Sequence, residues 1–426
     1  MRRCSPPALL GALCALLAPA SAVAATDQSL RASLAASMRG AGPYSGALVI
    51  DLDAGRTLYA LRADSLRIPA SNEKLYTTAT AMLAFGPGGR LATRVYGNGS
   101  LDASGTYRGT LYLRGDGDPT FGTYSFTRRA YGAGATVSDL ALRLRTVGIR
   151  RVTGGVLGDE SRFDRRRGGL TFARSFYIGG PLSGLSFNRG LANEYGSALQ
   201  TRPAAFAAAA LVRELRARGV AVAGPVTEGI TPPNSSLLAD VPSLTIATLA
   251  GLTNRPSDNY MAETLLKGIG AHFGAGGSTF AGAAAVRARL GPLGINARVV
   301  DGSGLSRANA TSPRQVVALL AHMRRTPAVA SAFAGSLAVA GRSGTLYARM
   351  RGTAASGRCR GKTGTLFGAS ALSGYCTAIG GRTLGFSILM NRVNVSSARS
   401  LQDRMAAAIA AYRLAPVARA TAPASR

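Results

Sequence analysis

The sequence predicts an α+β protein of two lobes, in which a second, β-rich lobe is inserted into the first. Three observations lead to this fold class. The chain has 426 residues, which exceeds the size of a typical single core. Short strand signals and many turn residues fill residues 91–230, and long helical patterns follow them. Because those long patterns continue to residue 412, we interpret 26–90 and 231–412 as the two parts of one main lobe.

The first part of the main lobe contains a helix, a hairpin and a second helix. An amphipathic pattern predicts a helix over 28–38. Strand patterns over 45–52 and 56–61 flank Asp53-Ala54-Gly55, which is typical of a β-hairpin. A helix over 71–84 then follows Pro69 and ends before Gly86.

The inserted lobe and the rest of the main lobe follow in order. Strands over 111–114 and 152–157, a helix over 204–218 and a linker over 231–236 are expected in and after the insertion. The second part of the main lobe should contain helices over 244–252, 260–273, 278–290 and 312–323, strands over 358–365, 369–378 and 382–390, and a terminal helix over 397–412. Residues 413–426 have little to bury and are expected to be disordered.

The N-terminus, residues 1–25, is typical of a secretory signal peptide. Arg2 and Arg3 precede an apolar run over 8–18, and the small-residue pattern Ala22-Val23-Ala24 follows. That run is too short to span a bilayer, and no later apolar stretch is long enough. We therefore expect an exported chain, periplasmic, in the cell wall or extracellular, with no transmembrane segment once mature.

The net charge of +30 favours an anionic environment. Export argues against nucleic acid as the partner, and no basic helix is interleaved with aromatic residues. An anionic cell-envelope surface remains as a candidate partner. The alternative is an arginine-biased composition whose charges are scattered over a solvated surface.

Ser71 and Lys74 form the first candidate catalytic pair. Three residues apart on a helix, they share one face, so the amine can reach the hydroxyl. Lysine occurs only at positions 74, 267 and 362, whereas nearly every other cation is arginine. A lysine can lose its proton when desolvated and act as a base, which an arginine cannot. On its own the pair is also compatible with a helix N-cap followed by a solvated cation.

Two further motifs follow in the order that a serine–lysine enzyme requires. Ser257-Asp258-Asn259 precedes a helix, where an N-cap is the simplest explanation of it alone. Lys362-Thr363-Gly364-Thr365 uses another of the three lysines and is harder to explain as packing. The three motifs together indicate one site assembled from distant segments.

These motifs and several longer strings resemble a known family. The strings are Pro69-Ala70-Ser71-Asn72, Gly117-Asp118-Pro119-Thr120, Ser161-Arg162-Phe163-Asp164, 301–307 (Asp-Gly-Ser-Gly-Leu-Ser-Arg) and 371–375 (Ala-Leu-Ser-Gly-Tyr). The sequence resembles the class C low-molecular-mass penicillin-binding proteins, the D-alanyl-D-alanine carboxypeptidase/endopeptidase family of penicillin-interacting serine peptidases. The resemblance implies a β-lactamase-like transpeptidase domain, an α/β sandwich whose antiparallel sheet is flanked by helices, with peptidoglycan peptides and β-lactams as substrates.

The resemblance also implies a role for each motif residue. Ser71 attacks the carbonyl of the penultimate D-Ala, and water or an amine resolves the acyl-enzyme. Lys74 is the base, provided that desolvation and the charge of Lys362 keep it neutral. Ser257 relays a proton to the leaving amine, and Asn259 binds Lys74 and the substrate backbone.

The remaining implied roles concern binding of the substrate's ends. Lys362, Thr363 and Thr365 hold the terminal carboxylate, and the backbone N–H groups of Ser71 and Thr365 form the oxyanion hole. No cofactor and no metal are expected. The 186 residues from Ser71 to Ser257 exceed what a plain β-lactamase needs but are short for two nested insert domains, so the innermost insert is expected to be missing.

Cys359 and Cys376 are the two cysteines outside the signal peptide. If their strands turn between Phe367 and Gly368, residues whose numbers add up to 735 lie opposite one another. The numbers 359 and 376 add up to 735, so the two cysteines should be opposite. We therefore predict a cross-strand disulfide at a non-hydrogen-bonded pair. Two free buried thiols are the alternative.

Other chemistries fit the sequence less well. A Ser-His-Asp hydrolase or a zinc site lacks ligands, since His272 and His322 both lie in helical patterns. A phosphate-binding loop fails because Ser356 stands where a glycine is required. Lys267 is interpreted as part of a solvated helix face.

Two alternatives to a peptidase remain. A serine β-lactamase would need a base for deacylation, and none of Glu160, Glu194, Glu214 and Glu228 lies in a recognisable deacylation loop. A catalytically silent, cationic envelope-binding protein would retain wall binding without activity.

Overall fold

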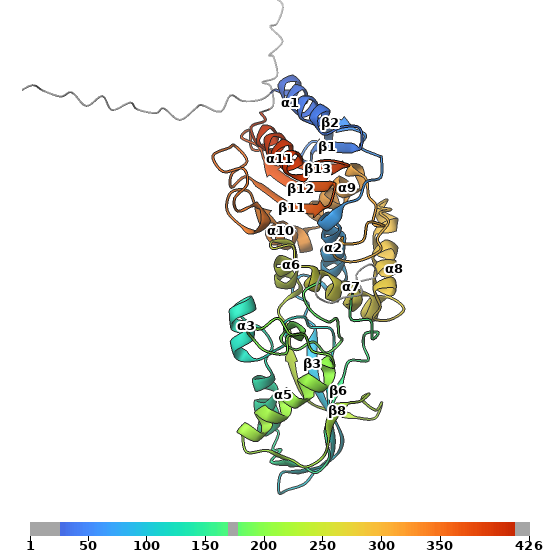
Figure 1. The fold of residues 1–426 in the computed structure, drawn as a ribbon, viewed down its shortest axis with the longest axis vertical. Helices are drawn as coiled ribbons and strands as arrows, with labels where there is room; N and C mark the ends of the chain where they lie inside the picture. Colours follow the sequence, from blue (N-terminus) through green and yellow to red (C-terminus); the bar gives the residue numbers. More distant parts are fainter. Residues whose placement is uncertain (1–25, 169–177, 414–426) are drawn as a thin grey trace, which may run out of the picture.

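The computed structural model describes residues 26–168 and 178–413, so the predicted signal peptide and the predicted tail from residue 414 lie outside it. The described chain is elongated and has two lobes, one around strands β11–β13 and the other around β3, β6 and β8 (Figure 1). Helices α6 and α7 lie between the two sheets in this view.

The main lobe is built on a six-stranded antiparallel sheet. Its strand order is β10-β11-β12-β13-β1-β2, so the N-terminal hairpin pairs with strands from the far end of the chain. In this sheet the strands before residue 90 pair directly with strands after residue 338. The strands are β1 (Ser45–Asp51), β2 (Arg56–Leu61), β10 (Ala338–Val339), β11 (Cys359–Leu366), β12 (Ala369–Thr377) and β13 (Thr383–Asn391).

Helices cover both faces of this sheet, which is why almost every residue of β12 and β13 is buried. Helices α1 (Asp27–Gly40) and α11 (Val395–Ala410) pack on the face that contains Ala47, Val49 and Phe386. The predicted α/β sandwich is therefore confirmed. The other helices of this lobe are α2 (Glu73–Phe85), α6 (Ile246–Asn254), α7 (Asn259–Phe273), α8 (Thr279–Leu290), α9 (Pro313–Arg325) and α10 (Pro327–Ser336).

The inserted lobe contains a mixed seven-stranded sheet with its own core. Its strands are β3 (Ala92–Leu101), β4 (Thr106–Gly115), β5 (Arg151–Val152), β6 (Val156–Asp159), β7 (Ala221–Val222), β8 (Val226–Glu228) and β9 (Ser236–Pro242), and its helices are α3 (Tyr124–Tyr131), α4 (Val137–Thr146) and α5 (Pro203–Ala217).

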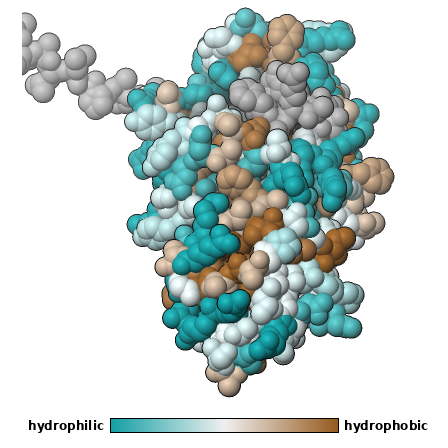
Figure 2. Space-filling view, turned by 60° about the horizontal axis from the view of Figure 1, so that its bottom comes forward, coloured by the Kyte–Doolittle hydropathy of each residue, from teal (hydrophilic) through white to brown (hydrophobic). Residues whose placement is uncertain are grey.

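Two expectations about this lobe need correction. The boundary expected at residue 230 comes too early, because β9 pairs with β3 and so belongs to the inserted sheet. Besides the expected helix over 204–218, the lobe contains two short helices, α3 and α4, which the sequence did not predict. Figure 2, which brings the inserted lobe forward, shows hydrophilic residues over most of this face and hydrophobic ones gathered near its middle.

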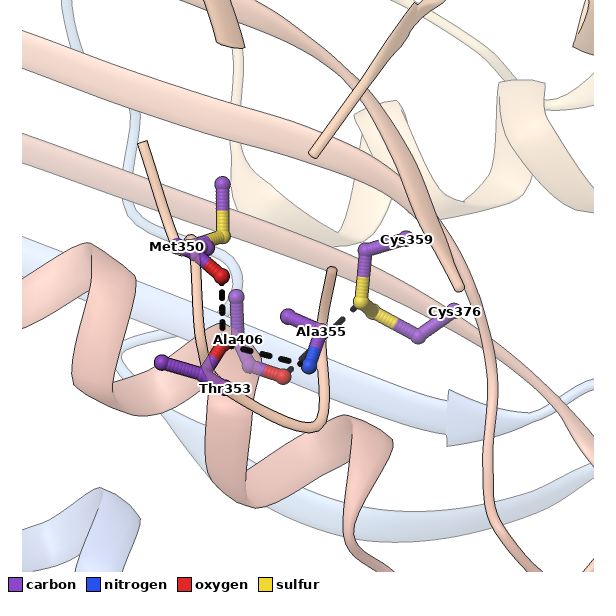
Figure 3. The surroundings of a disulfide bond; sticks show 6 residues. All are labelled: Met350, Thr353, Ala355, Cys359, Cys376 and Ala406. Carbon is purple, nitrogen blue, oxygen red and sulfur yellow. Dashed lines mark hydrogen bonds between the residues drawn. A yellow bond between two sulfur atoms is a disulfide. The ribbon is translucent and has the colours of Figure 1, made fainter. Parts of the chain in front are cut away.

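The hairpin of β11 and β12 has the predicted register. Cys359 lies opposite Cys376, and each pair down to Leu366 and Ala369 keeps the same sum of residue numbers. The two cysteines form a disulfide with a Cα–Cα distance of 4.0 Å (Figure 3). The backbone groups of Cys359 bond to Ala355 and Ala340 rather than to β12, so this is a non-hydrogen-bonded pair, as predicted. The sulfur of Cys359 also contacts the carbonyl oxygen of Ala406 on α11 at 3.8 Å (Figure 3).

Candidate active site

Ser71 lies in a single 3-10 turn, Ala70–Asn72, that leads into α2. Ala70 has a φ of +47°, so the turn holds a non-glycine residue in the left-handed region. Strand β11 comes directly against this turn. A Cβ at Gly364 would lie 2.6 Å from the Pro69 oxygen and 3.1 Å from the Ser71 nitrogen. The glycine of the Lys-Thr-Gly-Thr string is therefore what lets the strand reach the serine.

Lys74 is fully buried beside the half-buried Ser71. Its Nζ donates to Ser71 Oγ at 3.0 Å and to Asn259 Oδ1 at 2.7 Å. A third bond, at 2.6 Å, goes to the backbone oxygen of Ser303. The first two predicted motifs and the 301–307 string thus meet at one amine.

Lys362 links the second and third motifs. Its Nζ donates to Ser257 Oγ at 2.8 Å and to the Thr363 backbone oxygen at 2.8 Å. Ser257 has a φ of +64°, a conformation that serine rarely adopts and that turns this residue out of the helix that follows. Thr363 Oγ1 donates to Thr345 Oγ1 at 2.8 Å.

The Ser257-Asp258-Asn259 motif both caps a helix and contacts the candidate site. Asp258 is the N-cap of α7, because its Oδ1 accepts the Met261 N–H at 2.9 Å. The same carboxylate pairs with Arg189. Its neighbour Asn259 contacts Lys74. The N-cap interpretation is therefore correct for Asp258 and incomplete for the motif.

The amides predicted for an oxyanion hole lie close together. Thr365 lies an even number of residues after Cys359 in β11, and the pairing with β12 is unbroken between them, so both residues belong to non-hydrogen-bonded pairs. In an antiparallel pair the N–H groups alternate in direction, so that of Thr365 points away from β12. The Ser71 amide lies next to Gly364, the residue that precedes Thr365 in β11.

Burial sets the charge of both lysines. It lowers the pKa of Lys74 to about 8, against the opposing effect of Asp301, Asp258 and other nearby carboxylates. Burial, and secondly the charge of Lys74, lowers the pKa of Lys362 well below its ordinary value. Desolvation, which we expected to act together with the charge of Lys362, is the main cause of the lowered pKa of Lys74. A free-base amine next to a serine hydroxyl is the arrangement needed for a general base.

Two acidic residues position the loop above Lys74: Asp301, from the 301–307 string, and Glu263, which the sequence did not single out. Glu263 Oε1 accepts the N–H groups of Gly302 at 3.1 Å and of Ser303 at 2.9 Å. The carboxylate of Asp301 accepts those of Gly304 at 2.8 Å and Ser306 at 2.6 Å. Together they fix the Ser303 carbonyl that Lys74 contacts. The available signal for Glu263 was its spacing of four from Asn259, which places both on one face of α7.

The match to known families decides which enzymes this geometry belongs with. The D-Ala-D-Ala carboxypeptidase 3 (S13) family matches residues 28–178 and 182–412. The chain belongs to this family. The predicted enzyme class, a serine-type D-Ala-D-Ala carboxypeptidase, is thereby confirmed, as is the resemblance to low-molecular-mass penicillin-binding proteins.

Individual relatives of this S13 chain agree with the family match. It is 30% identical to a D-alanyl-D-alanine carboxypeptidase of an Actinomadura species, over 87% of this chain and 82% of that protein. It is also 30% identical to carboxypeptidase DacB of Mycolicibacterium smegmatis, over 91% and 85%. In fold it is similar to penicillin binding protein 4 (dacB) of Haemophilus influenzae, with a TM-score of 0.70, 20% identity, and coverage of 89% and 99%.

The expectation that Lys267 lies on a solvated helix face is wrong. Lys267 is buried, and its Nζ pairs with Asp164 Oδ1 at 2.5 Å. A second bond, at 2.9 Å, goes to the Arg166 backbone oxygen. The Ser-Arg-Phe-Asp string is thus tied to α7 by this lysine, which has a structural contact and none with Ser71 or Lys74.

Glu73 is a further buried group beside Lys74. Neither of its carboxylate oxygens has a hydrogen-bond partner. Burial, with Asp301 and Glu263 nearby, raises the pKa of Glu73 well above its ordinary value. Burial therefore favours the neutral form of the Glu73 carboxyl beside Lys74. Within residues 26–168 and 178–413, no helix is both long and apolar enough to cross a membrane.

Proposed function

We propose that the protein is an exported carboxypeptidase and endopeptidase that cleaves peptidoglycan stem peptides through an acyl-enzyme on Ser71. The observation that supports this most directly is the 3.0 Å distance between the buried Lys74 Nζ and Ser71 Oγ, across which a free-base amine can accept the hydroxyl proton. The pKa of about 8 leaves part of that amine in the free-base form at neutral pH.

In the proposed acylation, neutral Lys74 takes the proton of Ser71 Oγ as this oxygen attacks the carbonyl carbon of the penultimate D-Ala. The amides of Ser71 and Thr365 stabilise the resulting oxyanion. Ser257 gives its proton to the leaving amine as the C–N bond breaks, and Lys362 at 2.8 Å, kept protonated by the bound terminal carboxylate, returns one to it. Water, or an acceptor amine, then attacks the ester and gives up a proton through Ser257 to Lys362, while Lys74 returns its proton to Ser71 Oγ as the ester bond breaks.

Binding of the substrate follows from the same residues. Lys362, Thr363 and Thr365 offer an amine and two hydroxyls to the terminal carboxylate, and the negative charge of that carboxylate favours the protonated form of Lys362 when the substrate binds. Asn259 holds Lys74 in place and can hydrogen-bond the substrate backbone. Penicillins would acylate the same serine, and solved Haemophilus penicillin binding protein 4 includes a complex with a β-lactam.

The test uses D-Ala release from a peptide ending in D-Ala-D-Ala, together with labelling by a fluorescent penicillin. Release should disappear in Ser71→Ala and persist in the control Ser100→Ala, an exposed serine of β3. A labelled band stable for many minutes supports the peptidase. Rapid loss of the band would support a β-lactamase instead, and activity that survives Ser71→Ala would reject the assigned nucleophile.

Export, envelope contact and domain division belong to the same proposal. The signal-like residues 1–25 and the net charge of +30 support an exported protein close to an anionic envelope. The peptidase domain would comprise residues 26–90 and the chain after β9, with the inserted lobe between them. Cell fractionation and mass measurement of the mature protein test export, and salt-sensitive sedimentation with cell walls tests envelope contact.

A further inference from the structure

A cavity of about 380 Å³ adjoins the candidate site. Part of its wall is the site itself, namely Ser257, Thr363 and Thr365. The rest is Thr345, Arg349 and Arg399, none of which has a role in the acylation proposed above. Half of the six residues that line the cavity therefore lie outside the residues assigned to the reaction.

The two arginines of the cavity differ in how their charges are balanced. Arg349 pairs with Asp403 at 2.7 Å and donates to Gln402 Oε1 at 3.2 Å. It also donates to the backbone oxygen of Arg399 at 3.2 Å, which holds the first turns of α11 against the cavity. Arg349 thus serves mainly to fix this wall.

Arg399 is exposed and donates to Thr365 Oγ1 at 3.0 Å. Among the described residues no ion pair joins it to a carboxylate. A guanidinium has five N–H donors, so most of them remain available after the bond to Thr365. The cavity therefore has an uncompensated positive charge next to the strand that is proposed to hold the substrate's end.

The position of this charge relative to the scissile bond indicates what it would bind. In the proposed function, on which this inference rests, Lys362, Thr363 and Thr365 hold the carboxylate of the leaving residue. Other substituents of that residue then extend past Thr365 into the cavity. D-Ala offers only a methyl group there, which cannot use a cation.

We propose that Arg399, positioned by Arg349, forms an anion subsite for the leaving group of the reaction. It favours a leaving amine that bears a second carboxylate besides the one next to the amine. Acidic D-amino acids and the acceptor peptide of a peptidoglycan cross-link share this chemistry. The subsite would therefore direct the enzyme toward cross-linked or acidic leaving groups beyond simple release of D-Ala.

The test compares three N-acyl peptides that end in D-Ala-D-Ala, D-Ala-D-Gln and D-Ala-D-Glu. The last two leaving groups have the same shape and differ by one charge. In the parent we expect kcat/KM for D-Glu release to exceed that for D-Gln release by about three- to tenfold. In Arg399→Gln this ratio, taken within the variant, should fall to about one. Arg399→Lys should keep part of the ratio.

The matched control is Arg404→Gln, which removes the same charge from an exposed position on the same helix. It should leave the ratio unchanged, which separates a local contact from the overall positive field. A cross-linked peptide dimer, with the acceptor carboxylate free or amidated, repeats the comparison for an acceptor peptide and distinguishes it from a free amino acid.

Each result has a defined meaning. A ratio that is the same in the parent and in Arg399→Gln overturns the subsite but not the peptidase. An equal loss with all three peptides, in a variant whose melting temperature is unchanged, assigns Arg399 to the terminal carboxylate and also overturns the subsite. A parent that cleaves none of the three overturns both the subsite and the proposed function.

Discussion

The pH dependence of acylation gives the sharpest test of Lys74 as the base. Because the pKa of Lys74 is about 8, about one-tenth of its amines are neutral at pH 7 and about nine-tenths at pH 9. The rate of labelling by a fluorescent penicillin should therefore rise about tenfold between these pH values. The assay is the initial labelling rate at constant ionic strength, at a penicillin concentration below saturation.

The variant Glu263→Gln tests whether the carboxylate near Lys74 sets the pKa of this lysine, as the structure implies. Two successive contacts, from Glu263 Oε1 to the Ser303 amide at 2.9 Å and from the Ser303 oxygen to Lys74 at 2.6 Å, connect the carboxylate to the amine. An estimated separation of about 7 Å at an effective dielectric of about 20 gives an attraction of roughly 2 kcal/mol, or about 1.5 pKa units. Since a nearby carboxylate raises the pKa of Lys74, its removal should lower that pKa and move the midpoint of the rate profile to lower pH.

The control for this shift is Asp159→Asn. Asp159 is a buried carboxylate of the inserted lobe that also accepts backbone N–H groups, those of Ser161 and Thr231, both at 2.9 Å. Its neutralisation should cost stability without moving the midpoint. A midpoint in Glu263→Gln that stays in place, or moves to higher pH, would refute the electrostatic argument for Lys74.

Two further predictions concern the strand beside Ser71. Gly364→Ala should reduce penicillin labelling by at least about a hundredfold, because the new Cβ would lie 2.6 Å from the backbone oxygen of Pro69. The control is Gly335→Ala on α10, where a Cβ would meet no atom within 4 Å, and this variant should label normally. Replacing Cys359 and Cys376 together by serine should lower the free energy of unfolding by about 3 kcal/mol, as estimated for a bridge that spans 17 residues, and leave labelling measurable. Urea titration of both forms checks the second prediction, and an unchanged unfolding midpoint would contradict it.

The parts of the fold that could be predicted from the sequence depend on short-range patterns. The register of β11 and β12 could be predicted from the position of the turn alone, because in a hairpin the turn position fixes which residues lie opposite one another. The meeting of Ser71, Lys74, Asn259 and Lys362 followed from motif spacing, and the hydrogen bonds agree with it. The catalytic roles of these residues stay proposals until they are tested.

The remaining features depend on contacts between distant segments. Lys267 is buried because its counter-charge, Asp164, lies 103 residues earlier in the chain, a pairing that no local pattern indicates. The inserted lobe extends past residue 230 because β9 adds to an edge already formed by β3. Arg399 reaches Thr365 only because the terminal helix packs against the site strand. In each case the partner could be identified only once the tertiary structure was known.

The shared sheet of the main lobe sets an order for folding. β1 pairs with β13, so that Ser45 lies opposite Met390, and the inserted sheet separates them in the chain. Contacts between residues close in sequence form faster than contacts across long loops. The inserted lobe can therefore become compact while the strands on either side of it are still apart. The hairpin that reaches Ser71 joins β1 only through β13. Ser71 therefore has Lys74 near it from the start, but it meets Lys362 and the Thr365 amide late, after nearly the whole chain has been synthesised.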